Sequence, residues 1–155
     1  MKKLLFLASA FVLGLSASAQ QKPDQVAKMP ENYNFGKIKM GTPVTTMFEI
    51  TNIGDKPLVI ESATAGCGCT TPEFTKEPVA PNGATKLKVG YNAANMGPFT
   101  KEVYIKFAGI PEQKVVRITG EVVDAAAYDA YTKSDEYKKW QKDQKKSKPA
   151  AKGTH

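Results

Sequence analysis

The central part of this chain alternates apolar and polar side chains with a period of two, in several short runs. In PVTTMFEITN (43–52), Phe48 and Ile50 fall on one face of an extended chain, whereas Glu49 and Thr51 fall on the other. The same alternation recurs in ATKLKVGYN (84–92), FTKEVYIKF (99–107) and KVVRITGEV (114–122). A period of two gives a β-strand one apolar face. These runs therefore predict half-buried strands, and no helical pattern interrupts them.

Turn-forming residues separate the runs. Glycine, proline and asparagine, which favour tight reversals, gather in NIGDKP (52–57), APNGA (80–84), NAANMGP (92–98) and AGIPEQ (108–113). Three shorter segments, YNFGKI (33–38), PLVIESA (57–63) and TPEFT (71–75), bring the expected total to about seven strands. Short strands with alternating faces and regular turns predict an all-β fold, an Ig-like antiparallel β-sandwich over residues 31–123.

The start of the chain has the three parts of an export signal. Lys2 and Lys3 are followed by the apolar run Leu4–Leu15 and by Ala17-Ser18-Ala19, a small-x-small pattern that signal peptidase accepts. The apolar run is too short to cross a hydrocarbon core of ~30 Å as a helix. We therefore expect residues 1–19 to be a signal peptide cleaved after Ala19, and residues 20–30 to be a linker. The mature chain is expected to be periplasmic or secreted, without a transmembrane segment.

Residues 124–155 form a lysine-rich tail of different composition. They hold eight lysines and five acidic residues, whereas residues 20–123 hold twelve basic and ten acidic residues. The excess of basic residues is therefore mainly a property of the tail. A nucleic-acid-binding domain carries a focused basic patch instead, so we do not expect nucleic-acid binding. Asp124 and Ser134 are suited to cap two short helices. The Lys, Pro, Ala and Gly residues from Ser147 onward are typical of disorder.

The tail allows two interpretations. It is either a solvated extension, or a segment that contacts an anionic envelope surface or an acidic protein. For contact with a lipid headgroup interface, the candidate residues are Tyr137, Lys138, Lys139 and Trp140, because aromatic rings beside lysines suit such an interface. Since the period-two pattern ends by Val123, we expect the tail to be dispensable for folding.

Short motifs in the predicted strands and in the turns between them resemble one known family. The most specific is Gly66-Cys67-Gly68-Cys69-Thr70, and the others include Phe35-Gly36, Pro57-Leu58, Gly97-Pro98-Phe99 and Ile118-Thr119-Gly120. Over residues 30–123, the sequence resembles the bacterial family called domain of unknown function 1573. That family is similar to hydin-like and major-sperm-protein-like Ig sandwiches. The resemblance implies an exported sandwich domain and implies no particular activity.

The residues that enzymes commonly use are sparse in this chain. The single histidine, His155, is the last residue, so a cysteine–histidine nucleophile pair has no base. No G-x-S-x-G, phosphate-binding loop or H-E-x-x-H motif is present. Glu49, Glu102 and Glu121 are interpreted as parts of solvated sheet faces. We therefore predict no catalytic residues, no cofactor and no enzymatic activity.

Cys67 and Cys69 are the only cysteines, and a metal is one interpretation of the pair. A closed zinc site needs about four ligands, and the terminal histidine cannot complete it. Copper(I) accepts two thiolates, and the methionines that could assist are Met40, Met47 and Met96.

The remaining interpretations of the two cysteines need no metal. A pair of buried reduced thiols is disfavoured by export. A local disulfide between Cys67 and Cys69 fits best, because residues two apart on an extended chain point the same way and Gly68 lets the backbone fold between them. So small a ring is expected to add only about 1.5 kcal/mol of stability. The disulfide would either fix the conformation of the turn or be a bond that is easily reduced.

Two functional classes follow from these observations. The first is an exported Ig-like binding or structural module of the bacterial cell envelope, with an unknown protein or an anionic envelope surface as its partner. The alternative is a thiol redox or copper-handling protein that uses Cys67-Gly68-Cys69. The first class is favoured because the sequence has no recognisable set of catalytic residues. The free-thiol content of the mature protein distinguishes the two classes.

Overall fold

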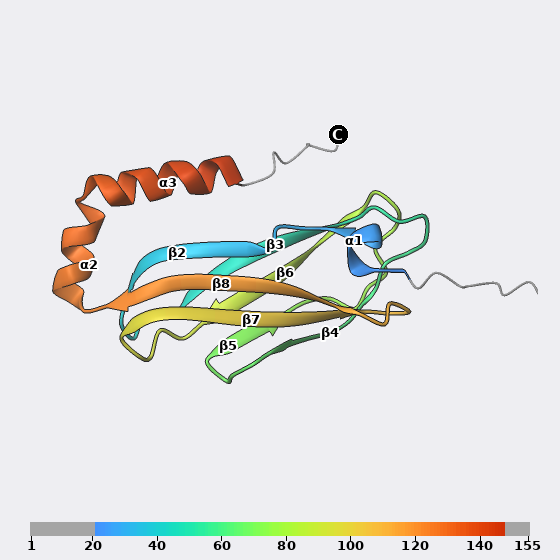
Figure 1. Ribbon diagram of the computed structural model, residues 1–155, viewed down its shortest axis with the longest axis horizontal. Coiled ribbons are helices and arrows are strands. Elements are labelled where there is room, and N and C mark those ends of the chain that lie inside the picture. The colour runs from blue at the N-terminus through green and yellow to red at the C-terminus, as the bar shows by residue number, and fades with distance from the viewer. Residues whose placement is uncertain (1–20, 148–155) are drawn as a thin grey trace, which may run out of the picture.

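The structure is a computed structural model that describes residues 21–147 (Figure 1). The predicted signal peptide, residues 1–19, and the terminal His155 lie outside the described residues. The strands are β1 Ala27–Lys28, β2 Asn32–Lys39, β3 Val44–Asn52, β4 Ile60–Ala65, β5 Thr70–Glu73, β6 Ala84–Tyr91, β7 Gly97–Phe107 and β8 Gln113–Val123, and the helices are α1 Pro23–Val26, α2 Ala125–Thr132 and α3 Asp135–Ser147. One sheet has the order β1-β3-β6-β5 and the other the order β2-β8-β7-β4. The predicted all-β sandwich is confirmed.

The inner faces of the sheets carry the apolar residues of the alternating runs. In the antiparallel pair β3–β6, Phe48 lies opposite Leu87, and in the antiparallel pair β7–β8, Val103 lies opposite Val116. All four side chains are buried in one hydrophobic core. Met47, the residue that interrupts the alternation in β3, is 58 % exposed. The period-two pattern therefore identified the inward face of these strands correctly.

Residues 23–28, which belong to the segment predicted to be a linker (residues 20–30), are instead part of the fold. Helix α1 leads into β1, which pairs antiparallel with the end of β3. Val26 and Ala27 are buried in the hydrophobic core. The sandwich thus has eight strands in the described part of the chain. A strand of two residues is too short to show an alternating pattern, which is why the sequence did not indicate it.

The sheet that contains β2 is mixed and not purely antiparallel as predicted. β2 runs parallel to β8, with Tyr33 opposite Ile118 and Ile38 opposite Val122. The pairs β7–β8 and β4–β7 are antiparallel. Parallel neighbours cannot be joined by a hairpin and need a long connection, which here is the chain from β3 to β7. Periodicity describes the two faces of a strand and carries no information on the direction of its neighbour.

Two helices follow the last strand, as the capping residues predict. The Ala127 amide donates to a side-chain oxygen of Asp124 (2.8 Å), and the Tyr137 amide donates to Ser134 Oγ (3.2 Å). Helix α2 leads away from the end of β8, and α3 turns back to run along β2 (Figure 1). No helix in the described part of the chain has the length and apolar character that crossing a bilayer requires.

Candidate functional site

Cys67 and Cys69 lie in the turn that carries the chain from β4, at the edge of one sheet, to β5, at the edge of the other. Their sulfurs form a disulfide, and the two Cα atoms are 5.3 Å apart. The Asn92 amide donates to the Cys69 carbonyl (3.1 Å), which ties the turn to the end of β6. The amide of the buried Thr70 donates to the Cys67 carbonyl (3.3 Å). The turn 66–69 is therefore a covalently closed crossover between the two sheets.

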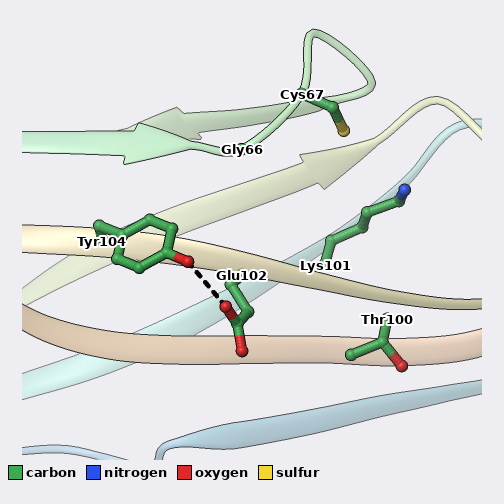
Figure 2. Close-up of a pocket in the computed structure, with 6 residues that line it drawn as sticks. All are labelled: Gly66, Cys67, Thr100, Lys101, Glu102 and Tyr104. Atoms are coloured by element: carbon green, nitrogen blue, oxygen red, sulfur yellow. Dashed lines mark hydrogen bonds between the residues drawn. The ribbon is translucent and has the colours of Figure 1, made fainter.

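The two cysteines have different surroundings. Cys69 packs against the hydrophobic core, whereas Cys67 lines a shallow surface depression of ≈ 270 Å³. The other lining residues are Gly66, Thr100, Lys101, Glu102 and Tyr104. Figure 2 shows the Cys67 sulfur and the Lys101 ammonium group pointing into the same space. Within residues 21–147, Lys101 forms no ion pair, so the depression holds an unpaired positive charge.

Glu102, which also lines the depression, has hydrogen bonds to both of its carboxylate oxygens. The Arg117 guanidinium donates to Oε1 (2.6 and 3.2 Å), and the Tyr104 hydroxyl donates to Oε2 (2.8 Å). The bond from Arg117, followed by that from Tyr104, lowers the pKa of Glu102 below its ordinary value. The same bond to Glu102 raises the pKa of Tyr104. An ionised carboxylate and a tyrosine held protonated are poorly suited to general acid–base catalysis near neutral pH.

The sequence did not indicate this network. It assigned Glu102 to a solvated sheet face and did not single out Arg117. The two residues lie directly opposite each other on β7 and β8. Their pairing follows from the register around the turn AGIPEQ (108–113), and alternation within each strand does not fix that register.

The described residues contain no group of three or more histidine, cysteine, aspartate and glutamate side chains that could hold a metal ion. The methionines considered as copper ligands, Met40, Met47 and Met96, are 48 %, 58 % and 59 % exposed. None of them lines the depression beside Cys67. The sulfur atoms at this place are those of the bonded cysteines, which must be reduced before they can act as thiolate ligands.

The C-terminal helices contact β2, an edge strand of its sheet (Figure 1). Tyr131 on α2 is buried, and the Lys37 ammonium nitrogen lies 5.7 Å from the centre of its ring. Burial is the main cause that raises the pKa of Tyr131. On α3, Trp140 Nε1 and Gln144 Nε2 both donate to the Asn34 carbonyl (2.9 and 3.0 Å). Helix α3 thus donates two hydrogen bonds to a backbone carbonyl of an edge strand.

The structure separates the four tail residues that the sequence grouped as a headgroup contact. Tyr137 packs edge-on against Tyr131 (ring centroids 5.3 Å apart) and stacks on Trp140 (5.5 Å). Lys138 and Lys139 are exposed. Because the chain bends between α2 and α3, the three rings form one cluster that faces the sandwich. The aromatic residues are therefore used within the molecule, and the two lysines face solvent.

Comparison with known proteins identifies one sequence family and several solved structures that are similar to this chain. The sequence profile of the family described as "Protein of unknown function (DUF1573)" matches residues 27–122. None of the curated proteins matches the chain.

Three solved structures illustrate the fold. A protein of unknown function from Porphyromonas gingivalis W83 matches with a TM-score of 0.55 and 17 % identity, over 63 % of this chain and 46 % of its own. The Vibrio cholerae VesB protease matches with a TM-score of 0.54 and 18 % identity, over 65 % of this chain and 33 % of its own. The ASH / PapD-like domain of human CEP192 matches with a TM-score of 0.55 and 9 % identity, over 81 % of this chain and 99 % of its own.

At these identities the likenesses concern the fold alone, and they agree with an Ig-like sandwich. The chain spans less than half of the length of the first two structures.

Proposed function

The chain belongs to the DUF1573 family, and from this premise we propose that it is an exported Ig-like binding module of the bacterial cell envelope that performs no catalysis. The alternating strands supply a rigid sandwich, and binding residues in such folds commonly lie on the turns that the scaffold positions. The proposed binding site is the turn 66–69 together with the depression beside it.

The observation that carries this proposal is the Cys67–Cys69 disulfide. Disulfides form and persist in oxidising compartments outside the cytoplasm, which supports export. A bridge between residues two apart closes too small a ring to add much stability. Its effect is therefore local, because it holds the turn 66–69 in one shape at the rim of the depression.

The depression also offers a recognition group. Lys101 places an unpaired positive charge beside Cys67, whereas Glu102 is already bonded to Arg117 and Tyr104. A partner that carries a carboxylate can pair with Lys101 without displacing an existing contact. We therefore expect a protein partner that presents an acidic side chain or a free C-terminus at this turn.

The site can be tested by affinity capture from envelope extract with the chain that begins at Gln20. We expect Lys101→Gln to lose the captured partner. Lys86→Gln is the matched control, because Lys86 is an exposed lysine on β6 in the other sheet. Equal capture by the wild type and both variants would refute a binding role for the depression.

Export is tested separately by the intact mass of the protein recovered from its native compartment. The mature chain should begin at Gln20 and be lighter than its reduced form by two hydrogen atoms. Retention of Leu4–Leu15 in the recovered protein would contradict cleavage, and full labelling of both thiols without reductant would contradict the disulfide.

A second candidate, thiol–disulfide exchange, is favoured by the position of Cys67 beside Lys101 (Figure 2). A nearby ammonium group stabilises a thiolate. In this exchange, the thiolate of an external thiol would attack one sulfur, and the other would leave as a thiolate. Reductase activity toward a model disulfide that is lost in Cys67→Ser would support this candidate. A copper ion bound to the reduced protein would instead support copper handling.

A further inference from the structure

The contacts of α3 with β2 determine which side of this helix faces solvent. Trp140 and Gln144 bond to the Asn34 carbonyl, and the Tyr137 ring stacks on Trp140. With about 100° between successive residues of a helix, these three side chains fall within about 60° of one another. They define the docked side of α3.

The opposite side of α3 is mostly lysine. Six exposed side chains lie within about 75° of the direction opposite to the docked side, and one of them is Asp135. The other five are Lys138, Lys139, Lys142, Lys145 and Lys146, and we call them the lysine face. Lys138 pairs with Asp135 (2.8 Å), and within residues 21–147 the other four form no ion pair. The positive charge of the tail is therefore concentrated on one side of a helix that the sandwich holds in place.

We propose that the lysine face docks on the anionic headgroups of a phospholipid membrane, with α3 lying on the surface and not inserted. Clusters of lysines on one side of a helix bind anionic lipid surfaces through summed attraction. The rings that could insert, Tyr137 and Trp140, point away from this side and toward β2. Binding is therefore electrostatic, without an apolar anchor.

The chemistry of the lysine face favours a lipid surface over an acidic protein. Protein interfaces are commonly anchored by a buried aromatic or arginine residue, and the lysine face has neither. Lysine is a point charge on a flexible stem, which suits diffuse negative charge better than a fixed bidentate contact. The face is also convex, since it is the outer side of a single helix. This inference adds a membrane-binding surface to the proposed function. It rests on that proposal in one respect, namely that the exported protein reaches an envelope membrane.

The test is co-sedimentation of the chain that begins at Gln20 with vesicles of phosphatidylcholine alone or mixed with phosphatidylglycerol. Only the vesicles with phosphatidylglycerol should bind, and added salt should weaken the binding. The double variant Lys142→Gln/Lys146→Gln should bind at least about tenfold more weakly. Lys56→Gln/Lys76→Gln is the matched control, because it removes the same charge from two exposed lysines outside α3. Equal weakening by both variants would refute a specific role for the lysine face.

The orientation of the bound helix is tested through Trp140, the only tryptophan of the chain. Phosphatidylglycerol vesicles that contain brominated lipid should leave the fluorescence of Trp140 unquenched, because the ring stays against β2. Strong quenching would overturn the docked orientation. Absence of vesicle binding would overturn the proposal, and binding to polyglutamate alone would identify an acidic protein as the partner. Either failure would leave the export test and the Lys101 test of the proposed function unaffected.

Discussion

Gly36 lies where β2 passes beneath the C-terminal helices, and it has a positive φ of 68°. A Cβ atom at this position would lie 2.5 Å from the Tyr131 hydroxyl oxygen and 3.2 Å from Trp140. Glycine therefore permits both the local backbone conformation and the close approach of the tail. The Gly36 amide also donates to the Asn34 side-chain oxygen (2.8 Å), which holds this irregular part of the strand.

We predict that Gly36→Ala destabilises the protein by more than Gly41→Ala. Gly41 has a similar φ of 72°, but a Cβ there would have no neighbour within 4 Å. Both variants carry the cost of a left-handed conformation, about 1–2 kcal/mol, and only Gly36→Ala must also displace Tyr131. Urea unfolding measures the free energies, and Trp140 emission should shift to longer wavelength in Gly36→Ala alone. Identical results for the two variants would mean that the tail does not rest on Gly36.

The pKa of Glu102 provides a test of its network with Arg117. Because its pKa is lowered in the folded state, Glu102 contributes stability above the pKa of an unperturbed glutamate. That contribution is lost as the pH falls through the lowered value. We predict that Arg117→Gln raises the pKa of Glu102 toward its ordinary value, as measured by NMR titration of the side-chain carboxyl carbon. Lys88→Gln, which removes the partner of Glu73 instead, should leave the pKa of Glu102 unchanged.

The C-terminal helices show what a sequence can and cannot predict about an element. Their existence and their caps were predicted, because Asp124 and Ser134 act on amides only three residues away. Their docking on β2 was not, because Trp140 meets Asn34 across more than a hundred positions of the chain. The expectation that the tail is a separable extension was drawn from the end of the alternating pattern. The alternation of apolar and polar residues predicts strands, but it carries no information about which other segments pack against the edge of a sheet.

We therefore predict, against that expectation, that the tail contributes to stability. Tyr131→Ala should lower the free energy of unfolding by about 3 kcal/mol, since a large aromatic side chain is removed from a buried site. Tyr128→Ala is the control on the same helix, because Tyr128 is only half-buried, and its effect should be under about 1 kcal/mol. Thermal or urea unfolding decides the matter, and equal effects of the two changes would restore the view of the tail as a solvated extension.

The N-terminal segment was missed for a similar reason, and it joins the two sheets. Its buried residues Val26 and Ala27 enter the core beside β3 in one sheet. Its acidic residue Asp24 pairs with Lys114 on β8 in the other sheet. Neither contact has a local signal in the sequence, because each partner lies far along the chain.

We predict that a mature chain without residues 20–28 is less stable by about 3 kcal/mol, mainly through loss of the buried Val26 side chain. Removal of residues 20–21 alone should have no measurable effect, since neither Val26 nor Asp24 is lost. Urea unfolding of the two truncated chains makes the comparison. If they unfold at the same denaturant concentration, residues 23–28 are a linker as the sequence suggested.

The fold as a whole should not depend on the disulfide. Most side chains of the core come from the strands of both sheets, and of the two cysteines Cys69 alone packs against it. Replacement of both Cys67 and Cys69 by serine should lower the free energy of unfolding by about 1.5 kcal/mol. The circular dichroism spectrum should be unchanged. Loss of cooperative unfolding in this double variant would show that the crossover turn is needed for the sheets to pack.

The parallel pairing of β2 with β8 has a mechanical consequence. The chain enters this sheet at Asn32 and leaves it at Val123, and the two strands point in the same direction. A force that pulls these two points apart therefore slides the strands past each other along their length. In that geometry the load is shared by all the hydrogen bonds between β2 and β8 at once, whereas a hairpin under tension opens one bond at a time. A domain of this kind, held at both ends, would act as a stiff link that transmits tension before it yields.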